Sequence, residues 1–381
     1  HIFRREHLHG SFFSGVIKAS FGNLLGLRKI TMSDLSERQK LILALVIREY
    51  VEKVNPIGSE RLVEDYSLNF SSATVRNEMA ALTEEGYLDK SHKMAGSTPT
   101  EEGYRYFVSQ LMGRTNLPSD TRHTIQHQFY QARHDIDQWM RLAASVLARQ
   151  SHGAALVTSL HPEHARLKHI ELIATRGRQV LMVLVLDGGE IRQQMLKLAE
   201  PVAQDKLSTT ANWVNEAAQQ RDAQEIKTLI SRTTDDLRSD ILQLTVDEML
   251  RSDKVLAGDI YRDGLANVLA EPEFLEPGVA HRALRFWEER SQLEDLLSQT
   301  VLSPETSGIH VLIGGEGTWE DLSDCAVVLS RYGVPGVATG ALGVLGPARM
   351  TYAHTISTVQ FVANLLSELV GDTLSNSTMS N

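Results

Sequence analysis

The side chains best suited to chemistry stand at the start of a predicted helix, within residues 71–77. In a helix-turn-helix, this end of the second helix meets base edges in the major groove of DNA. The candidate DNA-binding residues of this helix are Ser71, Ser72, Thr74, Arg76 and Asn77. Either serine can also cap the helix, because a hydroxyl accepts a hydrogen bond from the free amides of the first turn.

Two further elements position this helix. The predicted helix 72–85 carries an apolar face of Val75, Met79 and Leu82 at helical spacing, and Gly86 ends it in a left-handed conformation. A short helix is expected at 59–66 and a longer one at 36–54, which Pro56 stops. The sequence therefore predicts three helices, the last two forming a helix-turn-helix.

A hairpin is expected directly after these helices. The chain runs through residues 87–90, turns at Ala95-Gly96 and returns past 98–100, where a winged helix carries its wing. The candidate DNA-binding residues of the hairpin are Lys90, His92 and Lys93. With Arg61 and Arg76 they make a thin basic patch, which suggests that two copies bind DNA together.

Composition limits the class of protein. The 381 residues carry a formal net charge of −10, so DNA binding must come from a local patch and from helix dipoles. Residues 32–112 contain more Asp and Glu than Lys and Arg, which counts against strong phosphate binding. One cysteine excludes a disulfide framework and fits a reducing, cytoplasmic setting. No apolar run approaches the roughly 18 residues that span a bilayer, so no membrane partner is expected.

The two ends of the chain differ from its interior. Residues 1–31 are basic, contain serine and are poor in acids, like a transit peptide. We favour a disordered or non-native extension, with the native start at Met32. Residues 371–381 are polar, and we expect a disordered tail.

In the middle of the chain, the spacing of apolar residues changes several times between that of helices and that of strands. One long helix is expected at 121–149, strands follow up to residue 198, and the fully apolar run 180–186 predicts burial on both faces. A polar helical stretch at 205–253 interrupts a sheet that resumes at 255–261. Further expected elements are a helix at 276–300, strands at 309–313, 325–331 and 333–339, and a closing helix at 350–370.

Several constellations resemble enzyme sites without completing one. His161-Pro162-Glu163-His164 lacks the spacing of a metal site and is expected to be a solvated loop. Gly314-Gly315-Glu316-Gly317 has no following Gly-Lys-Ser/Thr, so a plain turn is expected. Gly340, Gly343 and Gly346 suit tight turns and close packing, and Cys325 suits a core position. We therefore expect no catalytic residues, no metal and no cofactor.

Several short motifs follow one another along the chain. The N-terminal motifs are Leu35-Ser36-Glu37-Arg38-Gln39, Pro56-Ile57-Gly58-Ser59, the run 71–79, Gly86-Tyr87-Leu88, Pro99-Thr100 and Gly103-Tyr104-Arg105. The C-terminal motifs are Asp263-Gly264, Pro272-Glu273-Phe274, Ile313-Gly314, and Gly346-Pro347-Ala348-Arg349-Met350. Together and in this order, these motifs identify the chain as similar to a known family, the heat-inducible transcription repressors HrcA, from Met32 to about Val370.

The resemblance implies an α+β multidomain fold. It consists of a winged helix-turn-helix and a GAF-like α/β domain with an inserted dimerisation domain. The expected segments are the extension 1–31, the DNA-binding domain 32–112, a linker 113–120, the first GAF-like segment 121–198, the insertion 199–254, the second GAF-like segment 255–370 and the tail 371–381. The resemblance also implies a homodimer on an inverted-repeat operator of groE/dnaK-type chaperone operons, inactivated by heat and supported by the GroEL chaperonin.

The chain departs from the family pattern in the wing, where Lys93-Met94 and Ser97 replace Thr-Ser and an arginine that follows the glycine. Lys93 can supply the missing charge from a neighbouring position. Glu316-Gly317 also stands where the family has Glu-Asn. Two alternatives stay open. One is a ligand-responsive winged-helix regulator with a small-molecule site in the GAF-like domain, and the other is an enzyme with a DNA-binding appendage.

Overall fold

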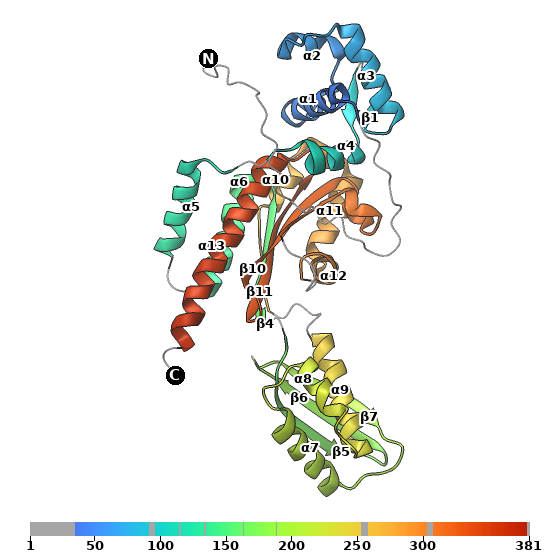
Figure 1. Cartoon of the computed structure of the whole chain (residues 1–381), viewed down its shortest axis with the longest axis vertical. Coiled ribbons are helices and arrows are strands. Elements are labelled where there is room, and N and C mark those ends of the chain that lie inside the picture. The colour runs from blue at the N-terminus through green and yellow to red at the C-terminus, as the bar shows by residue number, and fades with distance from the viewer. Residues whose placement is uncertain are drawn as a thin grey trace. The chain divides into compact units, whose positions relative to one another are not determined.

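The structure is a computed structural model that describes residues 35–90, 96–113, 116–132, 135–162, 164–187, 189–252, 258–302 and 308–378. The predicted extension 1–31 and the residues His92 and Lys93 lie outside this range. The chain divides into two compact units, with the main boundary between Gly113 and Arg114. Figure 1 shows the elements of each unit.

The first unit consists of helices followed by a small hairpin. Its elements are α1 Glu37–Lys53, α2 Ser59–Tyr66, α3 Ser72–Glu84, β1 Leu88–Lys90, β2 Ser97–Pro99, α4 Glu101–Tyr106 and the π-helical turn η1 Phe107–Leu111. Ser36 and Gln39 form a capping box that starts α1, and Val54 ends this helix in a left-handed conformation just before Pro56. The three helices predicted from the sequence are thus present within one residue at each end.

The second unit is built around a sheet with strand order β8-β3-β11-β10-β9, and β4 also pairs with β11. These strands are β3 Ala154–Thr158, β4 His161–Pro162, β8 Ile260–Asp263, β9 Ile309–Ile313, β10 Cys325–Val334 and β11 Ala338–Pro347. Residues 333–339 were predicted to be one strand, but the chain turns there between β10 and β11. Gly340, Gly343 and Gly346 lie inside β11 and not at turns, but the predicted close packing is present, since Gly340 packs against the ring of Tyr332.

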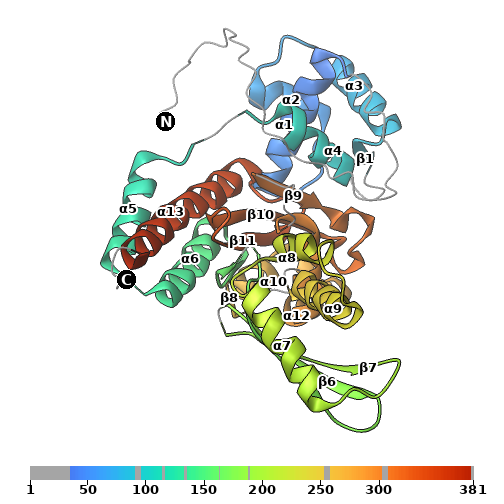
Figure 2. The same ribbon diagram turned by 60° about the horizontal axis from the view of Figure 1, so that its bottom comes forward.

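Helices cover both faces of this sheet. On one face, α6 Ile136–Ser151 and α13 Tyr352–Thr378 lie side by side, as Figures 1 and 2 show. On the other face, a core of aliphatic and aromatic side chains joins the strands to α10 Leu265–Leu269, η2 Pro272–Leu275, α11 Pro277–Glu288 and α12 Arg290–Thr300. The short turns η3 Gly314–Gly317 and η4 Glu320–Leu322 complete this layer.

Three helix predictions for this unit need correction. Residues 121–149 form α5 Ser119–Gln131 and then α6, because the Asp135 side chain accepts from the amide of Asp137 and starts a new helix. Residues 276–300 also form two helices, which meet at Glu289. Helix α13 runs past Val370 to Thr378 without a proline to stop it, so the predicted disordered tail is helical over most of its length.

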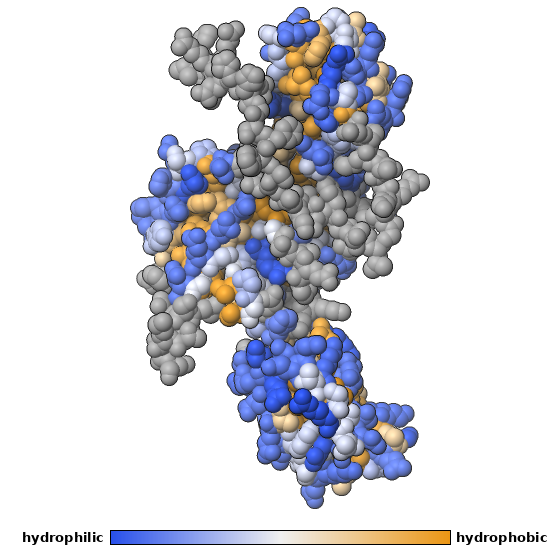
Figure 3. Space-filling model, in the orientation of Figure 1, coloured by the Kyte–Doolittle hydropathy of each residue, from blue (hydrophilic) through white to orange (hydrophobic). Residues whose placement is uncertain are grey.

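Residues 165–252 form a separate sheet with its own core. The antiparallel sheet β5 Leu167–Ala174, β6 Gln179–Leu186 and β7 Ile191–Lys197 packs against α7 Gln204–Ala218, α8 Ala223–Ile230 and α9 Asp236–Ser252. The insertion was predicted to start at residue 199, but its sheet already begins at Leu167. The face of this part that Figure 3 shows is largely hydrophilic, as expected for amphipathic helices whose apolar sides face the sheet.

Among the described residues, the three-stranded sheet is covered on one face only. In β6, Val180, Met182, Leu184 and Leu186 are buried, and the residues between them are only partly buried. The prediction that run 180–186 is buried on both faces is therefore wrong. Local sequence could not show this, because Leu181, Val183 and Val185 are as apolar as their buried neighbours.

Side-chain amides of α7 cover the outer edge of β5. Asn215 accepts from the amide of Ile170 at 2.8 Å and donates to the carbonyl of the same residue at 3.0 Å. Gln204 likewise accepts from the amide of Ala174 and donates to the carbonyl of Leu172. These bonds occupy backbone groups of β5 that would otherwise pair with a neighbouring strand. Within the described sheet, β7 at the other edge has a strand neighbour on one side only.

Candidate nucleic-acid interface

Helix α3 begins at a serine cap and buries one face. The Oγ of Ser71 accepts a hydrogen bond from the amide of Thr74 at 3.1 Å, so Ser71 is the cap and Ser72 is the first helical residue. Val75, Met79 and Leu82 are buried, as their spacing predicted. The cap and the buried face together fix which side chains of the first two turns point outward.

The polar residues predicted to contact DNA differ in their exposure and in their side-chain hydrogen bonds. Arg76 and Asn77 are exposed, and neither side chain forms a hydrogen bond or ion pair with any residue in the described ranges. Ser72 and Thr74 are partly buried, and the Thr74 hydroxyl lies 2.9 Å from that of Ser71. Ser71 and Thr74 thus hold the helix start, whereas Arg76 and Asn77 are available to a partner.

The hairpin pairs Leu88 with Pro99, Asp89 with Thr98 and Lys90 with Ser97. Lys90 is exposed at the end of β1. The backbone of Ser97 also exchanges two hydrogen bonds of 2.9 Å with Ile57, which adds a third extended segment beside β2. Gly96 must lack a side chain, because a Cβ there would lie 2.8 Å from the carbonyl carbon of Pro56.

Residues 86–103 join the hairpin to the helices through local contacts. Gly86 has a φ of +82°, the left-handed conformation that was predicted for the end of α3. Thr100 caps α4 by accepting from the amide of Gly103, and its hydroxyl donates to the carbonyl of Gly86 at 2.6 Å. A Cβ on Gly103 would lie 2.3 Å from the carbonyl oxygen of Tyr87. The motifs at 86–88 and 99–105 therefore serve the fold.

Arg61, expected near a DNA face, belongs to an ion-pair group between α1 and α2. Its Nε lies 3.5 Å from Asp65 and 4.0 Å from Glu49, a carboxylate only 5% exposed. Glu49 also pairs with Lys53 at 2.6 Å, and this contact lowers the pKa of the Glu49 carboxyl. Burial, with the hydrogen bond to Glu49, raises the pKa of Tyr66 to about 12. Arg61 is thus engaged within the protein.

Sequence reasoning missed one basic residue beside α3. Arg38, in the first turn of α1, places Nη1 3.2 Å from Oε1 of Glu78 and its guanidinium 4.9 Å from the ring centre of Phe70. Phe70 and Glu78 lie 32 and 40 positions further along the chain than Arg38, so no local spacing could indicate these contacts. Only the motif that contains Arg38 drew attention to this position.

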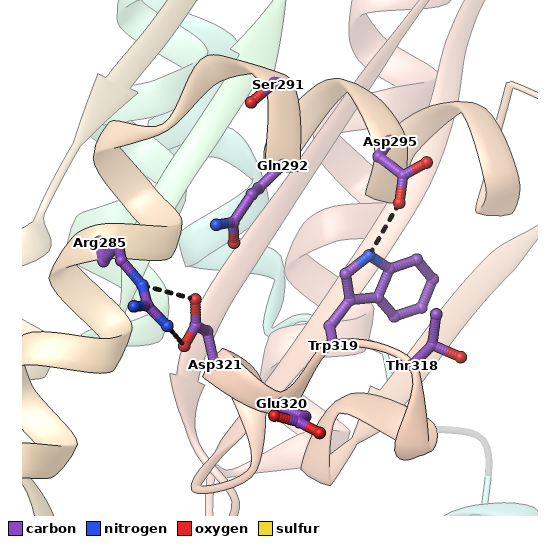
Figure 4. A pocket seen from close by; sticks show the side chains of 8 residues that line it. All are labelled: Arg285, Ser291, Gln292, Asp295, Thr318, Trp319, Glu320 and Asp321. Atoms are coloured by element: carbon purple, nitrogen blue, oxygen red, sulfur yellow. Dashed lines mark hydrogen bonds and ion pairs between the residues drawn. The ribbon is translucent and has the colours of Figure 1, made fainter.

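A hollow of about 410 Å³ lies between α11, α12 and η4 in the second unit (Figure 4). Two of the charged groups that line it pair with each other, because Arg285 forms a two-bond ion pair with Asp321. The indole Nε1 of Trp319 also donates to Asp295 at 3.2 Å. Its lining residues are Arg285, Ser291, Gln292, Asp295, Thr318, Trp319, Glu320 and Asp321.

The remaining chemical motifs show structural roles. His161 lies in β4 and is 9% exposed, so the prediction of a solvated loop is wrong at that residue. Gly314–Gly317 forms a 3₁₀ turn, in line with the plain turn predicted. Burial raises the pKa of the Cys325 thiol to about 12, which keeps it protonated at neutral pH. In the described part of the chain, no three His, Cys, Asp or Glu residues gather as a metal site.

Comparisons with known proteins agree over most of the chain. The family model described as HrcA protein C terminal domain matches residues 137–356. The heat-inducible transcription repressor HrcA of Roseiflexus castenholzii is 42% identical over 347 residues, which cover 89% of this chain and 96% of the relative. The repressor of the same name from Chloroflexus aurantiacus is 39% identical and covers 89% and 94%.

A solved crystal structure of a hypothetical protein shares the fold, with a TM-score of 0.53 and 23% identity over 89% of this chain and 98% of that one. The relatives place the chain in the class of transcription repressors, which suits the capped helix with its exposed Arg and Asn. Within that class, the chain belongs to the HrcA family of heat-inducible transcription repressors. No helix in the described ranges is long and apolar enough to cross a membrane.

Proposed function

We propose that this chain is a dimeric repressor that binds an inverted-repeat operator of chaperone genes and leaves it on heating. The observation that carries the proposal is the pair Arg76 and Asn77, exposed and unpaired among the described residues at the capped start of α3. Family membership makes DNA the partner that this pair would meet. The proposal assigns the chain no catalytic role and no cofactor.

We interpret the first unit as a winged helix. Helices α2 and α3 form the helix-turn-helix, and β1 and β2 form the wing, with Ile57 as its third extended segment. In this arrangement α3 enters the major groove with its N-terminal residues at the base edges. Ser72, Arg76 and Asn77 would make those contacts, and Ser71 and Thr74 would support them through the cap.

Phosphate contacts would come from few charges. Lys90 is exposed at the start of the wing, and His92 and Lys93 follow it in sequence outside the described residues. The positive end of the α3 dipole adds a partial charge at the same place. A chain of net charge −10 with so few basic contacts gains affinity by binding as two copies, one on each half of an inverted repeat.

The inserted unit offers a surface for pairing two copies. On the uncovered face of its sheet, Ile173, Ile191 and Met195 are 44%, 60% and 55% exposed. Leu181 lies between two of them, because it pairs with Ile173 on one side and with Met195 on the other. A contiguous apolar face of this kind on a soluble unit marks a protein contact. We assign it to the homodimer.

We interpret the larger sheet with its two helical layers as the GAF-like domain. The hollow beside Trp319 is the place where the ligand-responsive alternative would be tested, although Arg285 already pairs with Asp321, and Asp295 already accepts from Trp319. We favour control by marginal stability, since a repressor with a few kcal/mol of stability loses its folded population steeply on heating. We include a GroEL-type chaperonin as a partner because the family resemblance implies one.

A gel-shift titration tests the proposal. Duplexes selected from a random library by the full-length protein supply the operator, and scrambled versions of the selected duplexes supply the control. We expect tight binding to a duplex with two inverted half-sites and much weaker binding to its scrambled form. Equal affinity for both would refute the proposal. Affinity that changes only when a small molecule is added would favour the ligand-responsive alternative.

A further inference from the structure

Arg38 is a cation beside α3 that the proposed interface has not used. It projects from the first turn of α1, and its side chain is 46% exposed. One nitrogen, Nη1, donates to Glu78 at 3.2 Å. Its Nε and Nη2 have no partner among the described residues, so this side of the guanidinium fork is open.

The two partners of Arg38 place it next to the residues that would meet DNA. Phe70 directly precedes the cap Ser71. Glu78 follows Thr74 by one helical turn and therefore shares a face of α3 with it. Arg38 thus lies along the edge of α3 that starts at the cap, a position reached from α1 rather than from α3 or the wing.

The surroundings hold the guanidinium in place before any DNA arrives. The ring of Phe70 supports it from one side, at 4.9 Å from the ring centre, and the Glu78 carboxylate fixes its direction. Planar guanidinium groups held this way suit phosphate oxygens, which accept two parallel hydrogen bonds from the open side of the fork. Without Arg38, the Glu78 carboxylate would present an unbalanced negative charge to the DNA backbone.

We propose that Arg38 binds a backbone phosphate of the operator, with Phe70 and Glu78 as the residues that position it. The inference rests on the proposed DNA-binding function and adds a contact from α1 that the recognition helix and wing do not supply. A purely stabilising role explains the geometry less well. An ion pair this exposed contributes little to stability and leaves no reason for an open guanidinium edge.

The test compares full-length variants on the selected operator and on a random-sequence duplex across a range of salt concentrations. A phosphate contact contributes about one unit per protomer to the slope of log affinity against log salt. Arg38→Ala is expected to remove that unit and to weaken binding about equally on both duplexes. Arg176→Ala, an exposed arginine of the inserted unit, is the matched loss of charge and should leave the slope unchanged.

Further variants keep the test decisive. Arg38→Lys retains the charge and should keep the slope, and Arg38→Gln replaces Arg38→Ala if the latter melts early. Glu78→Gln removes a negative charge but keeps an oxygen that can accept from Nη1, so it should bind both duplexes at least as tightly as the wild type. An unchanged slope in the charge-removing variant, or a loss confined to the operator, would each overturn the phosphate assignment. Wild-type protein that fails to prefer the operator would instead overturn the proposed function itself.

Discussion

Replacing Arg76 by alanine separates DNA recognition from folding. Arg76 is exposed and forms no ion pair with the described residues, while Glu78, the acid nearest to it along α3, is bound by Arg38. Removal of the side chain therefore breaks no described contact. Surface substitutions of this kind usually change stability by less than about 0.5 kcal/mol. The melting temperature of Arg76→Ala should remain close to that of the wild type.

The expected loss of affinity is much larger. A bidentate contact between an arginine and a guanine contributes about 1–3 kcal/mol of discrimination. A dimer loses two such contacts, or about 2–6 kcal/mol, and every 1.4 kcal/mol is about a factor of ten in affinity. Arg76→Ala should therefore bind the operator at least tenfold more weakly, with a smaller loss on scrambled DNA.

The assay pairs gel-shift titrations with melting curves on the same preparations. Ser71→Ala provides the contrast, because Ser71 caps α3. Loss of a cap costs about 0.5–2 kcal/mol of stability. In a unit of this size, each kcal/mol lowers the melting temperature by roughly 4–8 °C. If Arg76→Ala binds the operator like the wild type, or if its melting temperature falls as far as that of Ser71→Ala, the assignment of Arg76 to base recognition is wrong.

Three other outcomes are expected. Lys93→Ala should weaken binding equally to operator and scrambled DNA and flatten the salt dependence by about one unit of slope per protomer. A loss of affinity on the operator alone would mean that Lys93 contacts bases instead of phosphate. Ile191→Lys with Met195→Lys should convert dimers to monomers in sedimentation without lowering helix content. Gln224→Lys, at an exposed position of α8, is the control, and a persistent dimer in the double variant would exclude this face. After a heat pulse, operator binding should recover further with chaperonin and ATP than without them, and full unaided recovery would argue against control by marginal stability.

Local sequence was sufficient wherever the signal lies within one helix or turn. The cap at residues 71–72, the buried spacing of Val75, Met79 and Leu82, and the left-handed Gly86 are each decided by neighbours a few positions away. The same local rules predicted the ends of α1, α2 and α3. For this reason the polar residues of α3 could be placed on its first turns from the sequence alone.

The remaining features depend on distant regions of the chain. Strands β5–β7 look no different in sequence from those of the larger sheet, so only their pairing shows that they form a separate sheet, which begins at Leu167. The contact of Arg38 with Glu78 spans 40 residues. Long-range pairing, rather than local preference, decided both of these points.

The break between α5 and α6 is a local feature, set by the Asp135 cap. It was missed because the apolar stripe continues across it.

The side-chain amides of α7 have a consequence for the behaviour of this protein in a heated cell. Gln204 and Asn215 occupy backbone groups of β5 that an incoming strand would need, and only β7 remains to receive one within the described sheet. A sheet with a single receptive edge can join one other sheet, after which no edge is left. Through this sheet, strand-by-strand polymerisation, the usual route to fibres when proteins loosen with heat, would therefore end at two molecules.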